Sequence, residues 1–496
     1  PTVEALAARL ESQAGSGAVA LVARDRPERI PLSLAQQRMW FLNRFAPESA
    51  VDNIPVAIRL AGRLDVDALH GAVADLVARH ESLRTVYPEI DGDGYQVVLP
   101  AGEVLPDLAP VEVAAEDVPA RVLELVGTGF DVTAAVPWRV ALLRISDEEH
   151  VLVFVVHHIS GDGFSMTPLT RDVVASYRAR TRHEPNPLPP LSVQYADYAL
   201  WQREVLGDED DPESVLSRQL DYWRAQLADL PEELTLPADR PRPAVASNHG
   251  AALRVPIDGE LHAALADLAR THNASVFMVV HTALAVLLAR LSGTDDIAVG
   301  TPVAGRGEAA LDDLIGMFVN TLVLRTAVEP GEPFADLLAR VRGTDLEAFA
   351  NADMPFERLV EVLDPPRSQA RHPLFQVMLT FQNLPQSALE LPHLSISGVE
   401  FDTAIAKFDL QVTVAEHLSE RGAPGGMTVE LAYATDLFDA PTMRSLADRF
   451  TRILRGVTAD AATPVGALPF LDDAEAERIL TEWSTLGPGA RVPAAA

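Results

Sequence analysis

The chain contains no cysteine. This excludes disulfides, thiolate metal sites and a cysteine nucleophile, and it suits a reducing compartment, so we expect a cytoplasmic protein. The sequence also lacks a cationic excess, because 40 lysines and arginines stand against 71 acidic residues and the formal net charge is −31. A nucleic-acid-binding face needs clustered Lys and Arg to replace phosphate counterions. We therefore expect no nucleic-acid partner.

A long uninterrupted apolar run is also missing. The most apolar stretch, SVFMVVHTALAVLLARL at 275–291, is interrupted by His281 and Thr282 and contains Arg290 near its end. It predicts a helix buried in a globular core, not a membrane span. The first residues, PTVEALAARLESQ, have the pattern of an amphipathic helix and lack the apolar core of a signal sequence. We expect no membrane partner.

What is present favours an α/β protein with a large core. Of the 496 residues, 48% are hydrophobic, and helical and strand patterns alternate from Ile30 onward. Two strand-like runs, VPWRVALLRI at 136–145 and HVLVFVVHH at 150–158, are separated by SDEE and predict a hairpin. A helical pattern follows Asp65, which is a suitable N-cap.

A weak internal repeat suggests two similar lobes. LHGAVADLVARH begins at Leu69 and LHAALADLARTH begins at Leu261, and each copy follows an extended segment. Either Ala-rich amphipathic helices simply look alike, or the chain holds a duplicated α/β lobe with a site between the copies, where pockets are common. Pro-rich connectors at 184–192 and 236–247 predict a boundary between the lobes near residue 200.

The stretch VLVFVVHHISGDGFS at 151–165 carries the clearest chemical signal. If the strand continues through His157 and His158, their side chains point to opposite faces, so one is structural and the other is available for chemistry. Glycines on both sides of Asp162 permit positive φ or close backbone approach. Adjacent strand residues seldom share a metal, so we expect no metal site. A core histidine beside a tight turn explains the residues equally well.

The segment HHISGDG fits HHxxxDG, the signature of condensation domains of nonribosomal peptide synthetases, within the chloramphenicol-acetyltransferase-like superfamily. The other segments that resemble the family's motifs occur in the family's order: LSLAQQRMWFL at 32–42, RHESLRT at 79–85, YADYALWQRE at 195–204, VGTPVAGR leading into IGMFVNTLVLR at 315–325, RHPLFQVMLTFQN and KFDLQVTV. The chain is identified as a member of this family over about residues 30–470.

The resemblance implies two lobes in a V-shaped pseudo-dimer, with a central tunnel and the signature loop at its middle. It implies that His158, the second histidine, has the central role, either as a general base with a pKa near 6.5 or by orienting the amine. The Gly163 N–H could contribute to an oxyanion site. His157 is expected to set the strand and loop. Asp162 is expected to be structural, in a bidentate pair with Arg306.

The same resemblance implies no cofactor of the domain's own, because substrates arrive on phosphopantetheine arms. The partners would be an upstream donor peptidyl carrier domain, a downstream acceptor peptidyl carrier domain and an adjoining adenylation domain. We expect the last carrier helix and a linker at 1–29, the N-terminal lobe at 30–200, the C-terminal lobe at 201–473 and a linker toward an adenylation domain at 474–496.

The expected reaction is peptide-bond formation from an L-configured donor to an L-acceptor. Heterocyclization domains replace the double histidine with a two-Asp pattern, which is not the pattern at His157 and His158. Two other functions stay open. One is a stand-alone acyltransferase that uses a soluble acyl thioester. The other is a non-catalytic module that docks carriers; silent relatives of that kind usually have a damaged signature, whereas this signature is intact.

Overall fold

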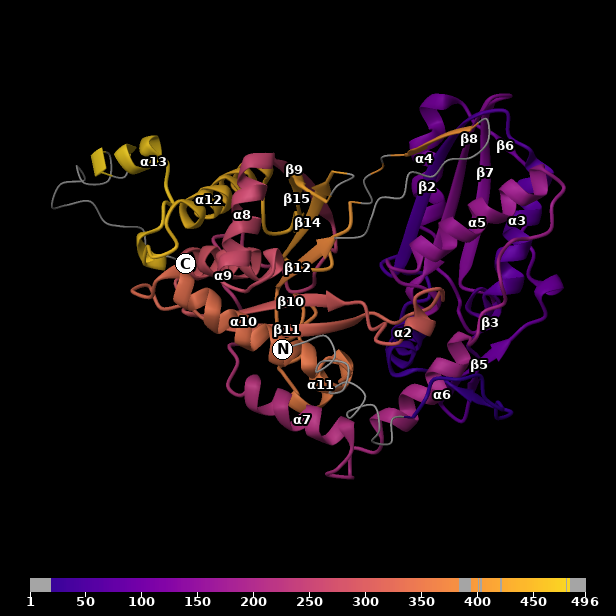
Figure 1. The fold of residues 1–496 in the computed structure, drawn as a ribbon, viewed down its shortest axis with the longest axis horizontal. Coiled ribbons are helices and arrows are strands. Elements are labelled where there is room, and N and C mark those ends of the chain that lie inside the picture. Colours follow the sequence, from indigo (N-terminus) through magenta and orange to yellow (C-terminus); the bar gives the residue numbers. More distant parts are fainter. Residues whose placement is uncertain are drawn as a thin grey trace, which may run out of the picture.

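The computed structural model describes residues 19–382, 394–399, 401, 404–419, 422–478 and 480–481. Two separate sheets, each covered by helices, form the two halves of the molecule in Figure 1. One sheet has five strands and the other has six. The mixed α/β class and the two-lobe arrangement expected from the sequence are therefore confirmed. The expected carrier helix at the start of the chain lies outside the described residues.

The N-terminal half is organised around one central, fully buried strand. The five strands run in the order β13 (Leu394–Gly398), β2 (Asn53–Gly62), β8 (Glu149–His157), β7 (Trp138–Ser146) and β6 (Val111–Glu112). β7 and β8 form the antiparallel hairpin that the sequence predicts. Alternate β8 residues join different core clusters, Val151, Val153 and Val155 on one face and Leu152, Phe154 and Val156 on the other. This two-sided burial is why β8 is a continuous apolar run.

The C-terminal half is built on the six-stranded sheet. Its strands run in the order β11 (Asn320–Ala327), β10 (Asp296–Val303), β12 (Val377–Gln382), β14 (Leu410–Leu418), β15 (Pro424–Ala434) and β9 (Gly250–Ile257). The largest core cluster joins this sheet to α8 (Gly259–Thr271), α9 (Val276–Ser292), α10 (Phe334–Ala350) and α12 (Ala440–Ala459).

The apolar stretch at 275–291 is a core helix, as predicted, because eleven of its residues in α9 are buried. Within the described part of the chain, no single helix is long and apolar enough to cross a membrane. The pair α8 and α9 together satisfies length and composition, but the two helices are bent by 101°.

Two segments tie the halves together. Strand β13 comes from the C-terminal part of the sequence yet pairs antiparallel with β2, and Figure 1 shows it lying along the edge of the N-terminal sheet. The connection between β10 and β11 also reaches across, since Leu311, Leu314 and Phe318 belong to an N-terminal core cluster. The second crossing runs through the two family-like segments VGTPVAGR and IGMFVNTLVLR. The pairing of β13 had no counterpart among the sequence predictions.

The internal repeat corresponds to equivalent elements in the two halves. Helix α3 (Val66–Arg79) follows β2 and is capped by Asp65, and α8 follows β9 and is capped by Asp258. In both cases the Asp side chain accepts a hydrogen bond from the backbone three residues on, which satisfies a free N–H of the first turn. The duplicated-lobe interpretation is therefore the better one.

The remaining elements connect and cover the sheets. The main ones are α2 (Leu34–Phe45), α4 (Val118–Val126), α5 (Met166–Thr181), α6 (Tyr195–Leu206), α7 (Val215–Gln226), α11 (Phe356–Leu363), α13 (Asp473–Arg478) and a small sheet of β1 (Ile30–Pro31), β3 (Thr85–Val86), β4 (Glu89–Ile90) and β5 (Asp93–Val98). Residue 200 lies inside α6, which together with α7 leads from one half to the other. The four domain ranges stay predictions.

Candidate active site

The signature loop begins where the central strand stops. β8 ends at His157, and a short 3-10 helix, η4 (His158–Ser160), begins at the next residue. The buried His157 causes this change, since its Nδ1 accepts a hydrogen bond from the Ile159 N–H at 3.1 Å and caps the helix. The strand therefore does not continue through both histidines, and the alternation argument does not apply. Local capping separates the two side chains instead.

His158 lies where loops of the two halves meet, beside Asp52 of the N-terminal half and Lys407 of the C-terminal half. Part of its surface is exposed. Its backbone N–H donates to the Asp52 carbonyl at 2.9 Å. Within the described residues its Nδ1 is buried and has no hydrogen-bond partner. Burial, and then the nearby Lys407 ammonium, lower the pKa of His158 to about 3. The pKa thus lies well below the unperturbed value of about 6.5 that would suit a general base: the imidazole is neutral at pH 7 and accepts a hydrogen bond more readily than it keeps a proton.

Asp162 is fully buried, and both of its carboxylate oxygens accept hydrogen bonds. Oδ1 accepts from the Ser165 N–H at 2.8 Å and from the Ser165 hydroxyl at 2.7 Å. Oδ2 accepts from the Phe318 N–H at 3.0 Å, on the segment that crosses from the other half. This carboxylate therefore closes the signature loop on itself and joins it to the crossing segment.

Arg306 is paired with Asp162 as expected, but not in the expected geometry. Only its Nη2 reaches the carboxylate, at 3.3 Å from Oδ1, so the pair is single and not bidentate. The physical reason is that Nη1 is used elsewhere: it donates to the carbonyl oxygens of Leu311 and Leu314. The guanidinium also lies 4.3 Å from the centre of the Phe318 ring. Arg306 thus fixes the crossing segment as well as the loop.

Of the two possibilities for the signature glycines, positive φ or close backbone approach, positive φ occurs at neither Gly161 nor Gly163. Gly161 is extended, at φ −165°, and its added Cβ would lie 3.1 Å from Val156 Cγ1, so close packing accounts for this glycine. Gly163 is exposed, and an added Cβ would meet nothing within 4 Å. Among the described residues its N–H has no hydrogen-bond partner. The Gly163 backbone is therefore free to contact a ligand.

A buried polar scaffold supports the loop from below. Gln36 of α2 donates to the Ile159 carbonyl at 3.2 Å, and the Tyr87 hydroxyl lies 3.0 Å from Ser160 Oγ. Tyr195 of α6 contacts Ser33 Oγ at 2.8 Å and donates to the Met317 carbonyl. These contacts explain physically why the segments at 32–42 and 195–204 accompany the signature. From the sequence alone, no single residue within these two segments could be assigned to the scaffold below the loop.

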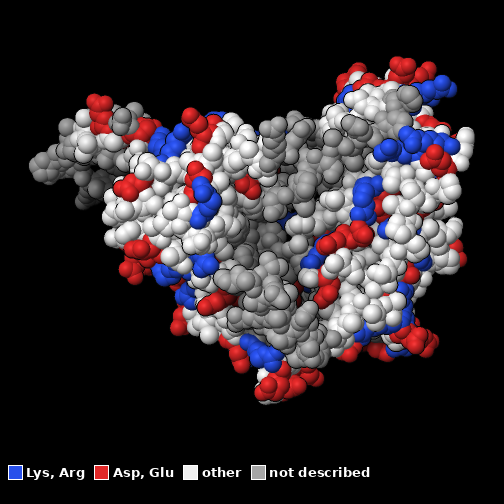
Figure 2. All heavy atoms as spheres, viewed as in Figure 1, with Lys and Arg blue, Asp and Glu red and all other residues white. Residues whose placement is uncertain are grey.

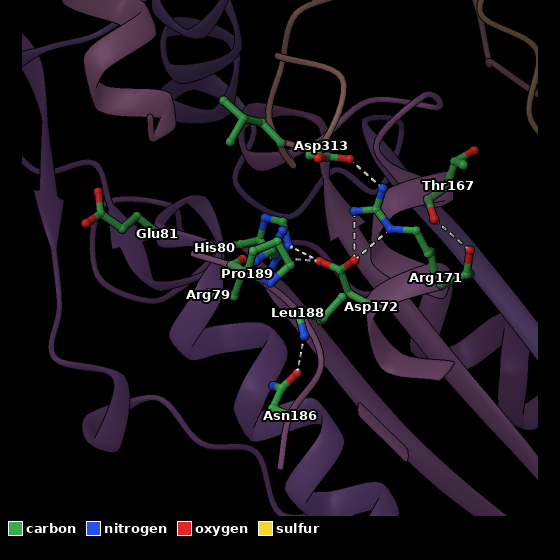
Figure 3. Close-up of polar contacts among 12 residues, drawn as sticks. Arg79, His80, Glu81, Thr167, Arg171, Asp172, Asn186, Leu188, Pro189 and Asp313 are labelled. Atoms are coloured by element: carbon green, nitrogen blue, oxygen red, sulfur yellow. Dashed lines mark hydrogen bonds and ion pairs between the residues drawn. The ribbon is translucent and has the colours of Figure 1, made fainter. Parts of the chain in front are cut away.

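A second polar cluster, shown in Figure 3, lies around α5 of the same half. The buried Asp172 of α5 contacts His80 Nε2 at 2.7 Å, Arg79 Nε at 2.9 Å and Arg171 Nε at 2.9 Å. Arg171 also pairs with Asp313 of the crossing segment. The cluster therefore anchors that segment to α5. Asp172 had no signal in the sequence, because nothing local marks it as the partner of residues some ninety positions away.

Outside the signature, a cleft opens beside α2. This cleft of about 930 Å³ is lined by α2 and by residues 355–361 of the C-terminal half. On this helix Phe41 is 56% exposed and Phe45 is 74% exposed, with their ring centres 4.7 Å apart. On the face drawn in Figure 2, acidic and basic side chains are interspersed over the described surface. No group of three or more metal-ligating side chains occurs in the described ranges.

The family model for the condensation domain matches residues 27–480. The chain belongs to the condensation domain family. Its relatives include the dimodular nonribosomal peptide synthase of Bacillus subtilis (strain 168), 47% identical over 98% of this chain and 20% of the relative. The chain thus spans about a fifth of that protein. Condensation domains of such synthetases are amide-forming acyltransferases.

Solved structures agree with this assignment. The X-domain in the complex of the X-domain and OxyB from teicoplanin biosynthesis is 36% identical, with a TM-score of 0.83 over 92% of this chain and 99% of that one. The first condensation domain of the calcium-dependent antibiotic synthetase, in complex with a substrate analogue, has the same fold, with a TM-score of 0.71 at 21% identity over 89% of this chain and 100% of that one.

Proposed function

We propose that the chain forms a peptide bond between a donor aminoacyl or peptidyl thioester on one carrier domain and the amine of an acceptor aminoacyl thioester on another. The observation that carries this proposal is His158: a partly exposed imidazole, held by its backbone at the junction of the two halves. Among the described residues neither ring nitrogen has a hydrogen-bond partner, and Nδ1 is the buried one. An upstream donor carrier, a downstream acceptor carrier and an adjoining adenylation domain are the partners.

The chemistry needs little from the protein beyond positioning. The acceptor amine attacks the thioester carbonyl carbon, a C–N bond forms, the C–S bond breaks, and the leaving thiol takes up the proton that the amine loses. Because His158 is neutral at pH 7, its proposed role is to accept a hydrogen bond from the amine and direct the lone pair toward the carbonyl. Its depressed pKa disfavours storage of a full proton on the ring.

Gly163 is the proposed oxyanion contact. Its N–H is unpaired within the described part of the chain, and the space beside its Cα is open. A backbone N–H aimed at the oxygen of the tetrahedral intermediate stabilises charge that develops only during the reaction. His157, Asp162 and Arg306 are proposed to hold the loop and not to touch the substrate, since all three are buried and engaged with protein groups.

For the carriers we propose a docking surface on α2. Phe41 and Phe45 form an exposed aromatic pair beside the cleft, and exposed contiguous apolar surface marks interaction sites. The arm of a docked carrier supplies the thioester, so the domain needs no cofactor of its own. An L-donor, an L-acceptor and a cytoplasmic location complete the proposal.

The deciding experiment is a single-turnover reaction with a donor loaded on one carrier and an acceptor loaded on the other, followed by mass spectrometry of the acceptor carrier. We expect a dipeptidyl product on the acceptor carrier, and far slower transfer when a soluble coenzyme A thioester replaces the donor carrier. Equal rates with the soluble thioester would instead indicate a stand-alone acyltransferase.

A docking module without turnover is the second candidate, favoured by the similarity to the X-domain whose structure is a complex with OxyB. The intact and fully connected signature loop, with Asp162 satisfied on both oxygens, argues for turnover. Carrier binding without any product in the same single-turnover reaction would decide for the docking module.

A further inference from the structure

Lys407 is the chain's only lysine, although the chain has 40 basic residues. It lies three residues before β14 of the C-terminal sheet, in the segment KFDLQVTV. Its Nζ contacts Asp52 Oδ1 at 2.8 Å. Asp52 directly precedes β2 of the N-terminal sheet. The ion pair therefore joins the two halves of the molecule through residues 355 positions apart.

The same Asp52 holds the backbone of His158. In the ladder between β2 and β8, Asn53 lies opposite His157, so Asp52 and His158 are the next pair, where both strands end. There the Asp52 carbonyl accepts the His158 N–H at 2.9 Å. One residue thus contacts Lys407 through its side chain and His158 through its backbone. Any movement of Asp52 moves the start of η4.

Electrostatics couple the three groups as well. Burial raises the pKa of Asp52, but the charge and hydrogen bond of the Lys407 ammonium, together with His158 and His157, lower it to about 2. Lys407 also contributes to the low pKa of His158, after burial. The lysine side chain is 37% exposed and the aspartate side chain 24%, so the pair lies at the edge of solvent and contributes little to global stability. Its removal should therefore leave the fold intact.

We propose that Lys407 is a positioning residue for the condensation reaction: by holding Asp52 across the two halves, it fixes the backbone of His158 and the approach of the halves at the site. The proposal rests on the function proposed above, since it assigns Lys407 a role in that reaction. A compact ammonium suits this task, because it is a point charge that holds Asp52 through one carboxylate oxygen, Oδ1.

The first test is a double-mutant cycle on single-turnover peptide formation with two loaded carriers. We expect Lys407→Met and Asp52→Asn each to lower the maximal rate by about tenfold or more while the carrier concentrations at half-maximal rate change less than about twofold. The double variant should be no slower than either single one, because both remove the same contact. Lys407→Arg should recover much of the rate.

A matched pair supplies the control. Arg340 and Glu332 form an ion pair of similar exposure, 41% and 18%, inside the C-terminal half. Arg340→Met and Glu332→Gln should leave the rate unchanged, and every variant should melt within about 2 °C of the unmodified protein. An unchanged rate in Lys407→Met, or losses that simply add in the double variant, would overturn the proposal.

A second readout is independent of turnover. Reductive ¹³C-methylation labels Lys407 as the only lysine, and its methyl resonance should shift in Asp52→Asn but not in Glu332→Gln. The imidazole resonances of His158 should shift in Lys407→Met. If the unmodified protein forms no peptide, the proposed function fails, and the His158 resonances alone test the positioning role. In that case, unchanged His158 resonances in Lys407→Met would overturn the positioning role. Normal turnover with unchanged His158 resonances in Lys407→Met overturns the positioning role alone.

Discussion

Replacing Asp162 by alanine should destabilise the fold more than it affects the chemistry. The change removes the acceptor for the Phe318 N–H, which is left buried and unpaired, and it leaves the Arg306 guanidinium without its carboxylate. The Arg306 side chain is only 7% exposed, so water cannot replace the lost partner. Ser165 loses two hydrogen bonds in the same step.

The size of this effect follows from the contacts that remain. Breaking a buried ion pair by removing one partner costs about 3–5 kcal/mol. A buried unpaired N–H adds about 1–3 kcal/mol. Arg306 keeps Leu311, Leu314, Ser165 and the Phe318 ring, so the total should lie near the low end, at about 4 kcal/mol. For a cooperative unit of about 150–250 residues, roughly one half of the molecule, 1 kcal/mol lowers the melting temperature by about 2–4 °C. The expected decrease for Asp162→Ala is therefore about 8–16 °C.

Thermal melting of Asp162→Ala beside Asp162→Asn measures this effect. Asparagine keeps one oxygen as acceptor for Ser165 but loses the charge opposite Arg306, so it should fall between alanine and the unmodified protein. At a temperature where both variants are folded, the single-turnover rate should fall far less than in a variant without His158. An Asp162→Ala variant that melts normally yet forms no peptide would refute the structural role and assign the carboxylate to the chemistry.

Acid should destabilise the protein from about pH 6.5 downward, because burial lowers the pKa of His158 and His372 to about 3 and that of His157 to about 4. Below pH 6.5 these histidines are protonated in the unfolded chain but stay neutral in the folded protein. Their contribution to the unfolding free energy is therefore fully present above pH 6.5 and is lost as the pH falls toward these values. The loss is about 2 kcal/mol per histidine at pH 5. Denaturant titrations at several pH values should show a shallower loss for His372→Phe, whose ring would remain among aromatic neighbours; an identical pH slope would contradict this. Asp172→Ala should cost about 3–5 kcal/mol of unfolding free energy, since it leaves three donors around an empty buried position, and a normal melt would contradict that. Gly163→Ala should melt normally, because its Cβ enters open space, yet slow peptide formation if substrate occupies that space; full activity would remove Gly163 from the site.

Local sequence signals predicted what local physics determines. The hairpin of β7 and β8, the Asp65 cap and the buried helix α9 all follow from periodicity and capping, and all are present. The order of motifs along the chain predicted the family and the two-lobe fold. The resemblance predicted that Asp162 pairs with Arg306. It did not predict that the pair is made through a single contact and is not bidentate.

The parts that sequence could not predict depend on long-range contacts. Strand β13 is only five residues long, and its pairing with β2 is set by the other half's path through space. The ion pair of Asp52 and Lys407, like the cluster around Asp172, joins residues whose neighbours in sequence carry no sign of the partner. The end of β8 at His157 depends on one side-chain cap, which hydrophobic periodicity does not register.

The central claim is that His158 directs the acceptor amine, and His158→Ala tests it most directly. The measurement is the single-turnover rate of dipeptide formation between two loaded carriers, with the exposed His70→Ala as control. The account predicts that His158→Ala binds both carriers and melts normally but is clearly slower, while His70→Ala is unchanged. Because the ring orients the amine and does not store its proton, the loss should be smaller than the roughly 10²–10⁴-fold of a positioned acid–base group. A His158→Ala variant that is as fast as the unmodified protein would contradict the account.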